Sequence, residues 1–162
     1  MLAELEPHVE REACRALRGA VADCERPLVY WSGPYVASQG DFAPWNIRTL
    51  ENRIFVFDWE AGSSGASPLD DVLHYLLIDR AVHGFPLGPR ELAKAMAQAR
   101  EFAAENYPQW NWTPRVVSAF ALAYLLGVIL RYSVPDRRIS YRHPVIRRYW
   151  RLMERRGEWM VP

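Results

Sequence analysis

The sequence predicts a mostly helical α+β domain with one small antiparallel hairpin near its middle. Five segments repeat apolar residues at the spacing of a helix, and two short runs of strand composition lie between the first and the second of these segments. Half of the 162 residues are hydrophobic and 24% are charged, which is typical of a folded globular protein. We therefore expect a single domain, residues 1–162, with one hydrophobic core.

The first segment, residues 2–25, is expected to form a helix that Arg26-Pro27 ends. Its apolar residues follow one another at intervals of three or four: Leu2, Leu5, Val9, Ala13, Leu17 and Val21. After a short apolar run and a turn, the stretch from Val36 to Asn46 has no clean period. Its mixture of small, polar and aromatic residues indicates a functional loop.

The middle of the chain predicts a β-hairpin. Two runs of strand composition, Ile47 to Leu50 and Arg53 to Asp58, are separated by Glu51-Asn52, and two residues suit a tight hairpin turn. The Gly- and Ser-rich residues 61–68 that follow are expected to form a flexible connection.

Four helices are predicted after the hairpin: Pro68 to Ala81, Pro89 to Asn106, Pro114 to Tyr132 and Pro144 to Arg156. The third of them is the most apolar and is expected to be the most buried. Its fifteen uncharged residues, 116–130, are fewer than the ~20 that a membrane span needs, so a core helix is the better interpretation.

Composition excludes some classes of function and favours a location. A net charge of +1 argues against a nucleic-acid binder, which normally carries a strong positive field. Cys14 and Cys24 would lie about 15 Å apart along a helix, too far for a disulfide. Without a CxxC pair or a signal peptide, the chain is expected to be cytoplasmic, and we expect no membrane partner.

The loop and the hairpin bring three oxygen-bearing side chains toward one place. Asp41 and Asn46 flank a turn, and Asp58 ends the second strand, which should return it to the vicinity of Asn46. Two carboxylates and a carboxamide are hard ligands that suit Mg²⁺, which keeps several waters and shares its other positions with phosphate oxygens. In phosphoryl transfer an Asp can then face the acceptor hydroxyl while an Asn faces the metal.

Other polar residues are weaker candidates. His8, His74, His83 and His143 have no metal-ligand spacing, so each is expected to be a surface or hydrogen-bonded histidine. The arginines of the last predicted helix are interpreted as a solvated face, with an anionic acceptor or another lobe as the alternative. Four acidic residues could contact a cationic acceptor, and nothing in the sequence selects among them: Asp79, Glu91, Glu101 and Glu105.

Three motifs in order resemble the aminoglycoside phosphotransferase/choline kinase family, whose members are related to protein kinases. The motifs are the segments 40–47 (GDFAPWNI), 54–60 (IFVFDWE) and 67–71 (SPLDD). The family has His-Gly-Asp-x4-Asn, a hairpin, an Asp-Trp-Glu-like metal motif and a Pro-x-x-Asp helix start. The resemblance implies the helical C-terminal lobe of a kinase-like fold, in which the hairpin carries the catalytic and metal loops.

The resemblance also implies roles for individual residues. Asp41 matches the base that accepts the proton of the acceptor hydroxyl, and Asn46 and Asp58 match the ligands of Mg²⁺ that bridge to the ATP phosphates. Asp71 matches the aspartate that braces the catalytic loop, a role for which Asp70 is the weaker choice. Gln39 stands where the family has a supporting histidine, which puts the geometry of the loop in question.

The family's nucleotide-binding lobe has no counterpart in this sequence. No Gly-rich loop and no strand lysine precede the catalytic motif, and the first 37 residues are mostly one predicted helix. The expected function is transfer of the ATP γ-phosphate to the hydroxyl of a small molecule, with an N-terminal lobe supplied by a longer parent or a second chain. The alternatives are a catalytically inactive kinase-like remnant or binding module, and a fragment without function of its own.

Overall fold

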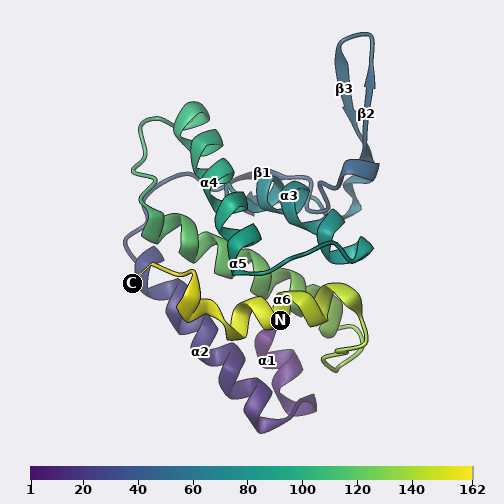
Figure 1. The fold of residues 1–162 in the computed structure, drawn as a ribbon, viewed down its shortest axis with the longest axis vertical. Helices are drawn as coiled ribbons and strands as arrows, with labels where there is room; N and C mark the ends of the chain where they lie inside the picture. The colour runs from purple at the N-terminus through teal and green to yellow at the C-terminus, as the bar shows by residue number, and fades with distance from the viewer. Residues whose placement is uncertain (162) are drawn as a thin grey trace.

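The computed structural model describes residues 1–161 as a mostly helical α+β fold with two small antiparallel sheets (Figure 1), which confirms the predicted fold class at this level. The helices are α1 (Leu2–Leu5), α2 (Arg11–Leu28), α3 (Asp70–His83), α4 (Pro89–Asn106), α5 (Pro114–Ser133) and α6 (Pro144–Glu154). The strands are β1 (Val36–Ser38), β2 (Ile47–Leu50), β3 (Arg53–Val56) and β4 (Ser63–Ala66). Short 3-10 helices occupy Glu6–His8, Pro44–Asn46, Trp59–Ala61 and Arg156–Glu158.

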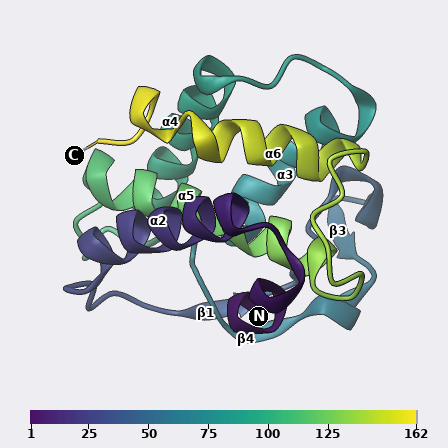
Figure 2. The same ribbon diagram turned by 90° about the horizontal axis from the view of Figure 1, so that it is seen from below.

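Helix α5 is the centre of the hydrophobic core. Figure 2 shows α2 and α6 on either side of it, and α3 and α4 also contact it. Leu122, Leu125 and Ile129 are fully buried along its length. It is the one helix among residues 1–161 long and apolar enough to cross a membrane, but 72% of that stretch is buried inside the fold. The prediction of a core helix is therefore confirmed.

Local sequence signals explain where the later helices begin and end. Helices α4, α5 and α6 each start with a proline, whose missing N–H would be unpaired in the first turn in any case. Thr113 caps α5 by accepting a hydrogen bond from Val116 N at 3.2 Å. Helix α3 stops at Gly84, which takes the left-handed conformation at φ +85°.

The prediction of one helix over residues 2–25 is wrong in two respects: the helix is interrupted, and it ends later than predicted. The chain forms α1, a 3-10 turn and then α2, because Pro7 lacks the N–H that an unbroken helix needs at that position. Helix α2 continues through Arg26-Pro27 to Leu28. There Pro27 lies in the last turn, so few backbone hydrogen bonds beyond it are affected, and Val29 N still bonds the carbonyl of Glu25 at 2.8 Å.

Two segments that were expected to be a loop and a flexible connection instead pair as a sheet. Strand β1 lies within the stretch 36–46, and β4 lies within residues 61–68. They pair antiparallel, with Val36 opposite Ala66 and Ser38 opposite Ser63. Their small residues show no alternation that would mark a strand in the sequence, so only the non-local pairing defines them.

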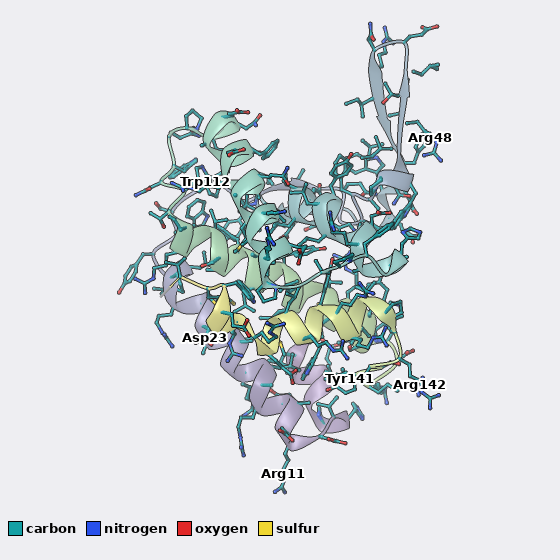
Figure 3. The ribbon with its side chains drawn as sticks, viewed as in Figure 1. Arg11, Asp23, Arg48, Trp112, Tyr141 and Arg142 are labelled. Atoms are coloured by element: carbon teal, nitrogen blue, oxygen red, sulfur yellow. The ribbon has the colours of Figure 1, made fainter. Side chains whose placement is uncertain are left out.

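Strands β2 and β3 form the predicted hairpin, with Ile47 opposite Val56 and Leu50 opposite Arg53. The predicted turn at Glu51-Asn52 is confirmed, and both residues have positive φ, as this type of tight turn requires. Strand β3 ends at Val56, two residues before the predicted end. The hairpin projects from the helical body (Figure 1), and Figure 3 shows its side chains, with Arg48 near its base, spread into open space.

Truncation of Leu125 is expected to test the core. Leu125→Ala should lower the free energy of unfolding by about 2–5 kcal/mol, because it removes buried methyl groups and leaves a cavity beside α5. Urea titration followed by circular dichroism measures the change. The matched variant Leu50→Ala lies on the hairpin, where the side chain is 63% exposed, and should cost less than about 0.5 kcal/mol. Equal costs at both positions would contradict this assignment of the core.

Candidate functional site

The loop between β1 and β2 is held in place by one carboxylate. Asp71, in the first turn of α3, accepts hydrogen bonds from Ser38 Oγ at 2.7 Å, Gln39 N at 2.8 Å and Gly40 N at 3.0 Å. Three donors on one carboxylate fix the direction in which the loop leaves β1. Within residues 1–161, Asp70 makes none of these contacts; its carboxylate instead accepts from Ser67 N, in the turn before α3, at 3.3 Å.

A glycine is required where the loop turns away from β1. Gly40 has φ +83°, and a Cβ atom built there would lie 2.3 Å from the carbonyl oxygen of Ala61. The carbonyl of Gly40 also accepts a hydrogen bond from the guanidinium of Arg131 on α5. The turn is therefore fixed by the 3-10 turn that carries Ala61 on one side and by the core helix on the other.

Gln39 joins the loop to the end of the hairpin. Its side chain is buried, and its Nε2 donates to the carbonyl oxygens of Phe57, at 2.9 Å, and of Asp58. Its Oε1 accepts from Asp41 N at 2.8 Å. One carboxamide thus supplies both a donor and an acceptor. Gln39 therefore connects the loop to the end of the hairpin, at the position where the family that the motifs resemble has histidine.

The carboxylate of Asp41 is fixed by two neighbours. Asn46 Nδ2 donates to Asp41 Oδ2 at 3.0 Å and to the backbone oxygen of Asp41 at 2.9 Å. His74 Nε2 lies 2.9 Å from Asp41 Oδ1. About one third of the Asp41 side chain remains exposed to solvent. The carboxylate is therefore oriented by the protein and still open to a ligand from outside.

His74 is the functional candidate that sequence reasoning did not single out. It is buried on α3, and its Nδ1 lies 3.2 Å from the hydroxyl of Tyr124, which in turn lies 2.9 Å from the hydroxyl of Tyr149. Burial lowers the pKa of His74, although the nearby Asp41 opposes the shift. The neutral ring then donates from Nε2 to Asp41 and accepts at Nδ1 from Tyr124. Its position three residues after Asp71 places both side chains on one helix face, which was the available signal.

Asp58 lies beside this loop on a sharp bend of the backbone. Its φ of +58° and ψ of +62° are left-handed, a conformation uncommon outside glycine and more frequent for Asp than for most residues. Strand β3 ends at Val56, so the alternation of side chains along the strand does not extend to Asp58. The preceding residue, Phe57, donates its N–H to the carbonyl of Asn46 at 2.9 Å, which brings this end of the hairpin back to the loop.

Two side chains near this bend keep oxygen atoms that could contribute to a cation site. Asp58 is exposed, and within residues 1–161 neither its carboxylate nor Asn46 Oδ1 accepts a hydrogen bond. In the same range no group of three or more His, Cys, Asp or Glu side chains could hold a metal on its own. Mg²⁺ commonly takes one or two protein oxygens and completes its shell with water and phosphate, so this donor set suits it.

Comparisons with protein-family models, with curated proteins and with solved structures found no match to this chain. The resemblance to the aminoglycoside phosphotransferase/choline kinase family therefore rests on three sequence motifs. The contacts described above join those motifs: Asp71 of the third bonds Gly40 of the first, and Gln39, next to the first, bonds Asp58 of the second.

Replacement of Asp71 is expected to loosen the loop. Asp71→Asn puts an N–H₂ group against the donors that the carboxylate now accepts from, and should lower the free energy of unfolding by about 2–4 kcal/mol. Urea titration measures the loss. Asp79→Asn on the same helix, where 43% of the side chain is exposed, serves as the control and should cost less than about 1 kcal/mol. A loss at Asp71 no larger than at Asp79 would mean that the loop does not depend on this carboxylate.

Replacement of the neighbouring Asp70 by asparagine is expected to raise the free energy of unfolding, and the gain should depend on pH. Burial raises the pKa of Asp70 to about 6, whereas an unfolded Asp ionises near ~3.9. Between these values the folded chain binds more protons than the unfolded chain, so this contribution to stability is complete below pH ~4 and is lost as pH rises through about 6.

Asp70→Asn removes this loss because the amide stays neutral. Unfolding free energies measured from pH 4 to pH 7.5 should show the variant gaining about 2–3 kcal/mol on the parent chain as pH rises, because roughly two pKa units at ~1.4 kcal/mol each give ~3 kcal/mol and a small part of that change lies below pH 4. A difference between the two proteins that stays constant over this range would show that Asp70 ionises normally when folded.

Proposed function

We propose that this chain is the catalytic-loop half of a phosphotransferase that moves the γ-phosphate of ATP to a hydroxyl of a small molecule. The observation that carries the proposal is the oriented pair of Asp41 and Asn46, whose side chains are bonded to each other at 3.0 Å beside the bend that presents Asp58. In this proposal the Asp41 carboxylate serves as the base, and Asn46 and Asp58 serve as the cation ligands that phosphoryl transfer requires beside it.

Asp41 is the base in this proposal. The hydroxyl oxygen of the acceptor forms a bond to the γ-phosphorus while the bond from that phosphorus to the bridging oxygen of ADP breaks. The proton of the hydroxyl passes to the Asp41 carboxylate. His74 and Asn46 hold the two carboxylate oxygens by hydrogen bonds, so the base does not have to reorganise when the acceptor binds.

Asn46 Oδ1 and the Asp58 carboxylate would hold Mg²⁺, which neutralises phosphate charge in reactions of this class. Asn46 uses its amide nitrogen on Asp41, and this leaves the amide oxygen for a cation. Gln39 fixes the backbone carbonyl of Asp58 and so limits how far the carboxylate can move from the loop.

The nucleotide-binding lobe would have to come from a further segment or a second chain. The single lysine of the sequence, Lys94, lies on α4 rather than on a strand that could contact phosphates. The hairpin carries apolar side chains with large exposed fractions at Leu50, Ile54, Phe55 and Phe57, and a surface of that kind suits a protein partner. Both cysteines are free, and we propose that the protein works in the cytoplasm, where thiols stay reduced and ATP is available.

Calorimetric titration of Mg·ATP into the chain is the first test. Saturable binding in the millimolar range is expected only when Mg²⁺ is present, because Asp58 and Asn46 reach the phosphates through the cation. Asp58→Ala should abolish this binding, and Asp136→Ala, the same change at an exposed site between α5 and α6, should leave it unchanged. Once an acceptor is found, Asp41→Asn should keep nucleotide binding and lower kcat by about 10²–10⁴-fold.

The alternative is a kinase-like scaffold that binds a ligand or partner without turnover. Absence of heat with millimolar nucleotide would contradict a nucleotide site on the chain alone and would favour this alternative. Binding that persists in Asp58→Ala would also count against the proposed function, because the nucleotide would then lie somewhere other than the bend at Asp58.

A further inference from the structure

A cavity of about 280 Å³ lies at the end of α5 that is remote from the loop between β1 and β2. Its walls come from the end of α2, the start of α5 and the segment that follows α6, which Figure 1 and Figure 2 show together on one side of the molecule. Arg115, in the first turn of α5, lines the cavity, whereas Arg131, in the last turn, bonds the carbonyl of Gly40. The stretch of helix between these two arginines is about 24 Å long. The cavity is therefore separate from the candidate site.

The lining of this cavity carries an excess of positive charge. Three guanidinium groups line it, those of Arg26, Arg115 and Arg156, together with one carboxylate, that of Asp23. Among residues 1–161 the formal charge of the lining is therefore +2, although the whole chain has a net charge of only +1. The arginines belong to α2, α5 and the 3-10 helix Arg156–Glu158, so the fold, rather than one stretch of sequence, brings them together.

Asp23 is already engaged by two of the arginines. Its Oδ2 accepts a hydrogen bond from Arg156 Nε at 2.6 Å, and its Oδ1 lies 3.4 Å from Nη2 of Arg26. Arg156 also donates from Nη1 to the carbonyl of Met153 at 3.2 Å, which fixes the direction of its guanidinium group. One carboxylate cannot neutralise three guanidinium groups, so positive charge and N–H donors remain for a ligand.

Arg115 is the arginine with the most donors to spare. The hydrogen bond at this residue involves its backbone, whose carbonyl accepts from Ser118 Oγ at 3.0 Å. Within residues 1–161 its guanidinium forms no ion pair. Arg26 has only the long contact with Asp23, and 69% of its side chain is exposed. Both side chains can therefore turn toward a ligand at little cost to the fold, and the planar fork of arginine matches the oxygens of a phosphate group.

We propose that this cavity binds the phosphate group of a small anion, either inorganic phosphate or a phosphate monoester. Such a group carries about two negative charges near neutral pH and offers several acceptor oxygens, which complements a lining of charge +2 with N–H donors to spare. Pro27 and Met160, also in the lining, would contact the organic part of a monoester. The volume is below the ~300–1,000 Å³ of sites for drug-sized ligands, so a phosphate with a small body fits and a nucleotide does not. The inference does not depend on the phosphotransferase function proposed above.

Three anions test the proposal: inorganic phosphate, phenyl phosphate and benzoate. Each is titrated at pH 7.5 and constant ionic strength into the full ¹⁵N-labelled chain, and amide shifts are followed by NMR. At least one of the two phosphates is expected to saturate at millimolar concentration and to shift the resonance of Gly157 in the cavity lining. Tighter binding of phenyl phosphate identifies a monoester site, and otherwise inorganic phosphate is the ligand. Benzoate should bind at least tenfold more weakly. Failure of both phosphates to bind, or equal binding by benzoate, would overturn the proposal.

Two matched variants locate the binding. Arg115→Gln removes one charge at the second residue of α5 and should weaken the phosphates at least fivefold. Arg90→Gln is the same change at the second residue of α4, where a proline also precedes an exposed arginine, and Arg90 is not among the residues that line the cavity. It should leave the affinity unchanged, and circular dichroism checks that both variants keep their helix content.

Undiminished affinity in Arg115→Gln, equal losses in both variants, or shifts confined to residues outside the cavity would refute the assignment. Mg²⁺ and nucleotide are absent from these titrations, and Asp58→Ala should bind phosphate as the parent chain does. Failure of the phosphate site and failure of the nucleotide site are therefore distinguishable.

Discussion

The three hydrogen bonds that Asp71 accepts hold the candidate site together. The donors Ser38, Gln39 and Gly40 are consecutive, and they lie at the end of a strand that has only one short partner. A two-stranded sheet of three or four residues is marginal on its own. The Asp71 carboxylate on helix α3, rather than the sheet, therefore fixes the direction in which the loop leaves β1. Gln39, which Asp71 holds, bonds the backbone carbonyl of Asp58. His74, on the same helix as Asp71, bonds the Asp41 carboxylate.

Local patterns predicted much of the fold, and non-local pairing accounts for most of what they missed. The hairpin turn at Glu51-Asn52 and the central helix α5 follow from signals within a few residues. Strands β1 and β4 were not predicted, because their small residues carry no period of two and they become strands only by pairing with each other. Pro7 is a local signal for the break between α1 and α2, but the regular spacing of apolar residues across it favoured one continuous helix.

The sequence likewise predicted one part of the candidate site and missed another. The order of the motifs placed Asp41, Asn46, Asp58, Gln39 and Asp71 near one another, and the structure brings their backbones and four of their side chains into one hydrogen-bonded group. The contact of His74 with Asp41 was not predicted, because 33 residues separate the two and no motif relates them. The left-handed bend at Asp58 was equally hidden, since Asp gives no sequence sign of that conformation as glycine does.

Asp70 and Asp71 show how position, rather than residue type, decides what a carboxylate does. They are adjacent on α3, but successive residues on a helix point about 100° apart, so Asp71 bonds the loop whereas Asp70 bonds Ser67 before the helix. The loop offers Asp71 three donors that offset the cost of removing its charge from water. Asp70 accepts from Ser67 N at 3.3 Å, and burial raises the pKa of Asp70 to about 6. Adjacent carboxylates on one helix therefore differ in effect: Asp71 orients the loop, whereas burial favours the neutral form of Asp70.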